Sequence, residues 1–254
     1  MKLFKLFILV SLLSACASQG GGSEGTPQGD TTRAQKIARI HTELAGMYYD
    51  RAQYGVALQE VAVALKADAG FPQAYNVRAL VRVALHENDK ADEDFQHSLR
   101  LDSANSETHN NYGWFLCQSG HIKESFKQFR DALNNPLYST PEVAYANLGL
   151  CSRKAGLTKE AESNLQRALV LRPDMPNALY GLADLNYSKG DFAAAKSYFN
   201  RFMQVNTEPN AEQLWLAVRI ERKMRDRNSE ASYTLQLRKN YPDSPEAQQL
   251  SQGQ

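Results

Sequence analysis

Small and apolar residues recur along this chain with a helical period, and the same order of residues returns after about 34 positions. The pattern is most complete over residues 142–173, which predict one helix ending near Ala155 and a second from about Lys159 to Arg172, separated by Gly156. A small residue late in the first helix marks the place where the two helices cross closely, because a larger side chain there would overpack. This position recurs at intervals of 34 or 36 residues, as Ala45, Ala79, Gly113, Gly149, Ala183 and Ala217.

The second helix of each unit repeats in the same way. A small residue precedes an apolar one by about one turn, which gives the helix a buried face. Six units therefore follow one another, and strand-like alternation of apolar and polar residues is absent from the sequence. The predicted pairs are Ala57 and Val61, Ala91 and Phe95, Ser125 and Phe129, Ala161 and Leu165, Ala195 and Phe199, and Ala231 and Leu235, of which the last arrives two residues late.

The unit resembles the tetratricopeptide repeat, in which W-x2-L-G-x2-Y is followed by A-x3-F and then Pro. The resemblance implies an all-α fold, a right-handed superhelical solenoid of about six helix-turn-helix repeats over residues 34–254. His41 and His109 take the Trp position of their repeats, where packing explains them better than metal binding. The fourth repeat carries the pattern as Tyr145, Leu148, Gly149, Ala161, Leu165 and Pro173.

Residues 1–15 are predicted to be a lipoprotein signal peptide. Lys2 and Lys5 form a basic region ahead of a short apolar run from Leu6 to Leu13, which is typical of a secretory signal and too short to span a bilayer. The segment Leu13-Ser14-Ala15-Cys16 resembles the lipobox of bacterial lipoproteins, which implies cleavage before Cys16 and acylation of that residue. No Asp directly follows Cys16. In this respect the segment resembles lipoproteins that are sorted to the outer membrane. An ordinary signal peptide with an incidental cysteine is the alternative.

Residues 16–33 are predicted to be a flexible tether behind the lipid anchor. The segment from Gln19 to Thr32 is rich in glycine and polar residues, so it cannot bury enough apolar surface to fold. About 14 such residues have a root-mean-square reach of roughly 20 Å. The solenoid could therefore work a short distance from the membrane.

Charge and motifs exclude several classes of function. Removal of the two signal-peptide lysines leaves 29 − 2 = 27 basic residues against 28 acidic ones, so the mature chain lacks the basic footprint that nucleic-acid binding needs. The sequence contains no metal-binding His-Glu-x-x-His, nucleophile elbow, phosphate-binding glycine loop or paired CxxC motif. We therefore expect no enzyme activity, catalytic residue, metal, cofactor, small-molecule substrate or nucleic-acid partner.

The first helices of such a solenoid line a concave surface, where binding usually takes place. Residues one turn apart on this surface are mainly apolar, aromatic or amide-bearing, which suits an extended or helical peptide with apolar anchors. The alternative is that the aromatic residues only pack against neighbouring helices. The predicted partner-binding residues are Asn76, Leu80, Asn110, Trp114, Leu150, Tyr180, Asp184 and Tyr187.

Two cysteines remain in the mature chain besides Cys16. Cys117 and Cys151 lie late in the first helices of adjacent repeats, which should run side by side. An exported protein meets an oxidising compartment, so the pair is predicted to form a disulfide.

The mature chain resembles the PilF/PilW lipoproteins of type IV pilus biogenesis. The marks are the lipobox at Cys16, six repeats, the run NNYGWFL over 110–116, the connector Asn135 to Pro141, and a tail of SYTLQL over 232–237 followed by Tyr241-Pro242. The resemblance implies a pilotin-like outer-membrane lipoprotein that faces the periplasm. It further implies binding to the pilus secretin and other pilus proteins, secretin localisation or multimerisation, and support of pilus fibres. A general envelope adaptor that recruits cell-wall enzymes or other outer-membrane complexes is the alternative.

Overall fold

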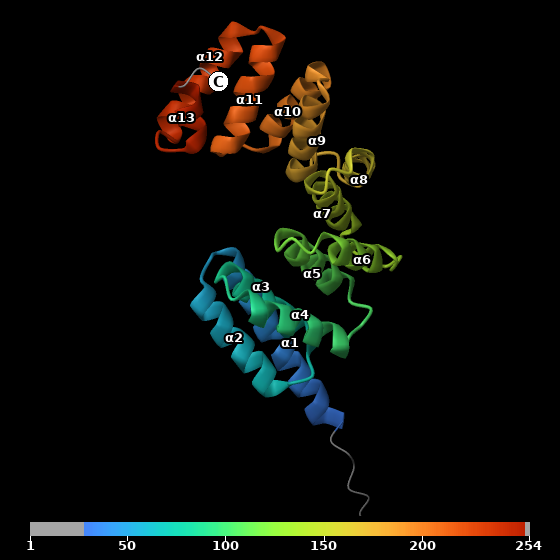
Figure 1. The fold of residues 1–254 in the computed structure, drawn as a ribbon. Helices are drawn as coiled ribbons and strands as arrows, with labels where there is room; N and C mark the ends of the chain where they lie inside the picture. The colour runs from blue at the N-terminus through green and yellow to red at the C-terminus, as the bar shows by residue number, and fades with distance from the viewer. Residues whose placement is uncertain (1–27, 252–254) are drawn as a thin grey trace, which may run out of the picture.

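The fold is a stack of helix pairs. The computed structural model describes residues 28–251, which form thirteen α-helices and, within that range, no strand. Figure 1 shows the stack running from α1 at one end to α13 at the other. The pairs are α1 (Gln28–Asp50) with α2 (Tyr54–Ala67), α3 (Pro72–Ala84) with α4 (Asn88–Leu101), α5 (Ser106–Gln118) with α6 (Ile122–Leu133), α7 (Pro141–Lys154) with α8 (Thr158–Leu171), α9 (Pro176–Lys189) with α10 (Phe192–Val205), and α11 (Ala211–Met224) with α12 (Arg227–Asn240).

Contacts between helices follow the order of the chain. The two helices of each pair pack together, and the first helices of successive pairs, α1, α3, α5, α7, α9 and α11, also touch one another. The short α13 (Pro245–Ser251) packs against α11 and α12, where Ala247 joins the last apolar cluster. The predicted all-α solenoid of six repeats is therefore confirmed.

The small residues late in the first helices are close to the second helices, as predicted. A Cβ on Gly149 would lie 2.7 Å from Leu165 Cγ and 3.0 Å from the Leu165 backbone nitrogen, and one on Gly113 would lie 2.9 Å from the Phe129 ring. The other four repeats use alanine at this position, and each of these alanines is at most 1% exposed. A larger residue at Gly113 or Gly149 would therefore collide with the second helix, and the other four repeats bury a small residue at the same position.

A left-handed residue ends the first helix of every repeat. Its positive φ reverses the chain direction and leads into the second helix. Three of these residues are glycines, which adopt this conformation freely, and three are not. In order they are Ala52 (φ 55°), His86 (60°), Gly120 (87°), Gly156 (75°), Gly190 (82°) and Arg225 (61°).

The sixth repeat departs from the prediction for its second helix. Ala231 is exposed and Leu235 is 67% exposed, so neither occupies the core position assigned to it. Leu237 is fully buried instead, and the ring of Tyr233 packs edge-on against Phe199 at 6.0 Å. The connector 206–210 is one residue longer than the connector 172–175, so α12 begins 35 residues after α10, and Ala231 and Leu235, each 36 residues after their counterparts, miss the positions of Ala195 and Phe199.

The N-terminal boundary also differs. Helix α1 begins at Gln28, so residues 28–33, which were assigned to the tether, are helical. Glycine and proline are absent from 30–45, so the local sequence allows the helix to extend back to Asp30, and the helix continues through Gly29 to Gln28. The predicted signal peptide, Cys16 and most of the tether lie outside the described residues.

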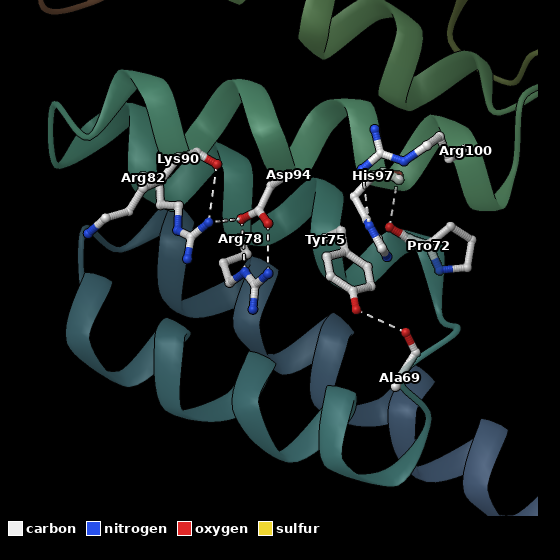
Figure 2. A network of polar contacts seen from close by, with 10 residues as sticks. Ala69, Pro72, Tyr75, Arg78, Arg82, Lys90, Asp94, His97 and Arg100 are labelled. Atoms are coloured by element: carbon white, nitrogen blue, oxygen red, sulfur yellow. Dashed lines mark hydrogen bonds and ion pairs between the residues drawn. The ribbon is translucent and has the colours of Figure 1, made fainter.

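A buried ion-pair cluster joins the two helices of the second repeat (Figure 2). Asp94 of α4 is 3% exposed and accepts two hydrogen bonds from Arg78, at 2.8 and 2.7 Å, and one from Arg82 at 2.7 Å. Both arginines come from α3, so three charge-assisted bonds hold this pair together.

We predict that Asp94→Asn destabilises the protein by about 2 to 3 kcal/mol, because it leaves two half-buried guanidinium groups without a carboxylate. Urea unfolding followed by circular dichroism measures the change. Asp131→Asn is the matched control, since Asp131 pairs with the exposed Lys127 at 2.6 Å, and an exposed pair contributes less than about 1 kcal/mol. Equal effects of the two variants would contradict a structural role for the Asp94 cluster.

Candidate partner-binding groove

A hollow of about 390 Å³ opens among the first helices of repeats three to six. Three of the predicted binding residues, Trp114, Leu150 and Tyr180, lie together in its wall. They come from α5, α7 and α9, so consecutive repeats each contribute one large side chain. Four of the other lining residues were not predicted and add polar groups and charge: Gln118, Lys154, Asn177 and Glu212.

The repeat register could have identified these additional residues. Gln118 and Lys154 lie 36 residues apart, which is the spacing between repeats three and four, and each follows a predicted position by about one turn. Asn177 and Glu212 are each the second residue of their helices, α9 and α11. A prediction that compared equivalent positions across the repeats, and not only one row of residues on each helix, would have included all four of these lining residues.

Trp114 has one side in the core and the other toward the hollow. It packs against the buried cluster of Cys117, Phe129 and Cys151, and it remains partly exposed where it lines the groove. A rigid ring held in this way can contact a partner at little cost in conformational entropy. Trp114 therefore both packs in the core and lines the groove.

Tyr180 is oriented by its neighbours on α10 and α11. Its ring lies 5.6 Å from that of Phe202, and its hydroxyl donates to Glu212 Oε1 at 3.2 Å. Burial, and after it the nearby Glu212 carboxylate, raises the pKa of the Tyr180 hydroxyl well above its ordinary value. Tyr180 therefore stays neutral and offers the groove an apolar ring face.

Asp184 and Tyr187 contact arginines of the neighbouring first helices. The Asp184 side chain is 13% exposed and pairs with Arg153 of α7, while Arg219 of α11 lies 4.0 Å away. The Arg219 guanidinium also lies 4.8 Å from the centre of the Tyr187 ring. Neither Asp184 nor Tyr187 lines the hollow, so the structure does not bring these two predicted residues together with Trp114, Leu150 and Tyr180.

Asn76 and Asn110 are also turned into the structure. They are 3% and 4% exposed, and their side-chain oxygens accept hydrogen bonds from Asn111 at 3.3 Å and from Asn147 at 3.0 Å. These amides connect neighbouring first helices. Asn110 therefore sits under the groove surface, and Leu80 packs against the apolar cluster around Phe95.

A second hollow, of about 380 Å³, lies between the first helices of repeats one to three, and Asn76 is part of its wall. Gln73 lines the same hollow, and its buried Oε1 has no hydrogen-bond partner within residues 28–251. The larger groove likewise contains one such atom, Arg153 Nε. Buried polar atoms of this kind are normally satisfied, so each hollow keeps an unmet hydrogen-bonding capacity.

A disulfide joins Cys117 and Cys151 and thereby links α5 to α7. The Cα atoms lie 6.0 Å apart, and both residues are fully buried. Lys154 of α7 reinforces the link, because its Nζ donates to the backbone oxygens of Cys117 at 3.1 Å and Gln118 at 3.3 Å. These bonds fix the separation of Trp114 and Leu150, which sit on the same two helices.

The two histidines in Trp positions contact the second helix of their own repeats. His41 Nδ1 lies 2.5 Å from Glu60, and His109 Nδ1 lies 2.6 Å from Gln128. Within residues 28–251 we find no group of His, Cys, Asp or Glu side chains that could hold a metal ion. In the same range no helix combines the length and the apolar character needed to cross a membrane.

Comparison with known proteins first defines the class. Residues 176–208 match the tetratricopeptide repeat family model, in agreement with the helix pairs and crossing residues described above. The protein is thus a tetratricopeptide-repeat protein with a groove along its first helices.

Relatives that match most of the chain then define the family. The crystal structure of PilW, a widely conserved type IV pilus biogenesis factor, shares 34% identity over 84% of this chain and 98% of PilW, with a TM-score of 0.76. The structure of Pseudomonas aeruginosa PilF shares 28% identity over 87% of this chain and 100% of that chain, with a TM-score of 0.78. The type IV pilus assembly protein PilF of the same organism is 28% identical over 245 residues, 96% of each chain. This chain belongs to the PilF/PilW family of tetratricopeptide-repeat proteins.

We predict that protein purified without reductant has no reactive thiol at Cys117 or Cys151 when titrated in denaturant. The bond closes a loop of 34 residues, so reduction should lower stability by up to about 4 kcal/mol in the chain-entropy model. The double variant Cys117→Ala with Cys151→Ala is the control, and its unfolding should not respond to reductant. Two reactive thiols in the unreduced protein would show that the bond does not form.

Proposed function

We propose that this protein is an outer-membrane lipoprotein that serves type IV pilus biogenesis by holding a segment of the pilus secretin in its groove. Family membership supports the pilus context, because both relatives are named as type IV pilus proteins. Acylated Cys16 would anchor the chain, and the solenoid would face the periplasm. Subunits held near the membrane in this way could meet and multimerise, which in turn would support stable pilus fibres.

The groove is the observation on which this proposal rests. Trp114, Leu150 and Tyr180 offer a place for one large apolar side chain of the partner. Around it, Gln118 and Asn177 offer hydrogen bonds to a peptide backbone. This combination of an apolar anchor site with a polar rim is typical of peptide-binding surfaces.

We predict that Trp114→Ala weakens secretin binding by roughly thirtyfold, because a buried aromatic anchor commonly contributes about 2 kcal/mol or more. Binding of the purified secretin periplasmic domain can be measured by calorimetry. Leu137→Ala is the matched control, since Leu137 is 88% exposed and lies in the connector before α7. Thermal melts of both variants check that Trp114→Ala still folds, and unchanged binding by folded Trp114→Ala would remove the groove from the proposal.

A general envelope adaptor is the second candidate, because an anchored solenoid with a peptide groove could also recruit cell-wall enzymes. Pull-down from solubilised envelopes separates the two functions. Recovery of a secretin supports the pilus role, whereas recovery of cell-wall enzymes without secretin supports the adaptor. A strain that lacks this protein should also lose heat-resistant secretin oligomers and surface pili, and normal amounts of both would argue for the adaptor.

We predict that Cys16→Ser abolishes attachment to the outer membrane, because the side chain that would carry the lipid is lost. Membrane fractionation should find the variant soluble or uncleaved, and mass spectrometry of the parent should find an acylated amino terminus at residue 16. The anchor would be ruled out by a parent without acyl groups and a variant that fractionates with the outer membrane as the parent does.

A further inference from the structure

The first repeat exposes apolar side chains at positions that repeats two to five bury. Ile40 and Met47 of α1 are 49% and 56% exposed. Moving along by one repeat at a time, the equivalent residues are Ala74 and Val81, Thr108 and Phe115, Ala144 and Cys151, and Ala178 and Leu185, none of which is more than 7% exposed.

These later residues contact the repeat before them. Ala74 joins a cluster with Ala38 and Ala64, the Phe115 ring lies 5.7 Å from that of Phe95, and Cys151 is bonded to Cys117. The face of α1 that carries Ile40 and Met47 is therefore the face on which a preceding repeat would sit. No preceding repeat is present among the described residues, and Figure 1 shows α1 and α2 at the end of the stack opposite α13.

Helix α2 adds two exposed apolar residues that break the pattern of its counterparts. Val56 and Val63 are 37% and 42% exposed. The equivalent positions in α4, α6, α8 and α10 are mostly charged, as Lys90 and His97, Glu124 and Asp131, Glu160 and Arg167, and Ala194 and Arg201.

The two exposed residues of α1 and the two of α2 lie at similar levels along this pair of antiparallel helices. His41 of α1 contacts Glu60 of α2 at 2.5 Å, and the two helices run in opposite directions. This register places Ile40 about level with Val63 and Met47 about level with Val56. We call Ile40, Met47, Val56 and Val63 the end patch.

Two possible covers of the end patch are poorly suited to it. Residues 17–27, which would precede α1 in the mature chain, contain no large apolar side chain that could fill the place of a missing helix. A second copy of the chain would need about 800 Å² on each partner for a stable interface. Four partly exposed side chains offer far less than that.

A lipid surface suits the end patch better, because apolar side chains can enter the head-group region singly and need no complementary partner shape. Cys16 precedes Gln28 by 28 − 16 = 12 residues, so an anchor there keeps α1 within about 40 Å of the bilayer. Arg33 and Lys36 are exposed just ahead of Ile40, and neither pairs with a carboxylate in the described part of the chain. Such cations favour anionic phospholipid head groups.

We infer that the end patch rests on the phospholipid surface of the membrane to which the chain is anchored, an inference that depends on the lipid anchor proposed above. The first repeat then lies against the bilayer, and the stack of repeats extends away from it. The groove of repeats three to six faces the periplasmic space at a distance from the membrane that the solenoid itself determines.

Site-specific photo-crosslinking tests this arrangement in the mature chain attached to vesicles of phosphatidylethanolamine and phosphatidylglycerol. Attachment through a lipid coupled to the Cys16 thiol makes the test independent of whether cells acylate that residue. A photoreactive benzoylphenylalanine replaces Met47 in one protein and Leu235 in its matched control, since Leu235 is 67% exposed but lies on α12. The Met47 site should give at least about fivefold more lipid adduct than the Leu235 site.

The same probe at Val63 should reproduce the Met47 result, which guards against a local disturbance at one position. Equal lipid adducts at the end patch and at Leu235 would overturn the inference, because the patch would then have no preferred contact with lipid. In intact cells, an adduct at twice the chain mass would instead identify a second copy as the cover, and an adduct with another protein would identify a protein partner. Mass spectrometry of the cellular amino terminus separately reports whether the lipid anchor itself exists.

Discussion

The close crossing of the two helices in each repeat is the constraint on which the rest of the molecule depends. At Gly149 an added Cβ would lie 2.7 Å from Leu165 Cγ and 3.0 Å from the Leu165 backbone nitrogen, and the other repeats keep the same position at glycine or alanine. A crossing this tight fixes the angle and separation within each pair. Because similar pairs are then stacked one on another, the arrangement of the first helices along the concave surface depends on the contact each of them makes with its second helix.

The periodic part of this architecture could be predicted from the sequence, because crossing residues and buried faces recur at nearly constant spacing. The prediction failed where the spacing changed. One extra residue in the connector 206–210 makes α12 begin 35 residues after α10, so Ala231 and Leu235 lie outside the core whereas Leu237 is buried. A register defined by helix caps, such as Asp191 and Asp226, would have been less sensitive to residue type.

The groove was predictable in part, and the reason is geometric. Helical spacing identified Trp114, Leu150 and Tyr180, which line the same hollow. It could not tell that Asn110 and Asp184 point sideways, because their partners Asn147 and Arg153 come from neighbouring repeats. The residues that line the groove are thus different from those that connect its neighbouring helices. This division allows the binding surface to change chemically while its supporting network stays intact.

The bond between Cys117 and Cys151 has a consequence for how the array as a whole moves. In a solenoid each repeat touches only its neighbours, so fraying starts at the ends and spreads one interface at a time. The crosslink joins repeats three and four, with two further repeats on the N-terminal side and two on the C-terminal side. Unfolding that advances from either end therefore meets a covalent barrier at the centre. A large partner assembly pulling on the groove would act on a joint that cannot slide apart, and the mechanical load would pass through the sulfur atoms.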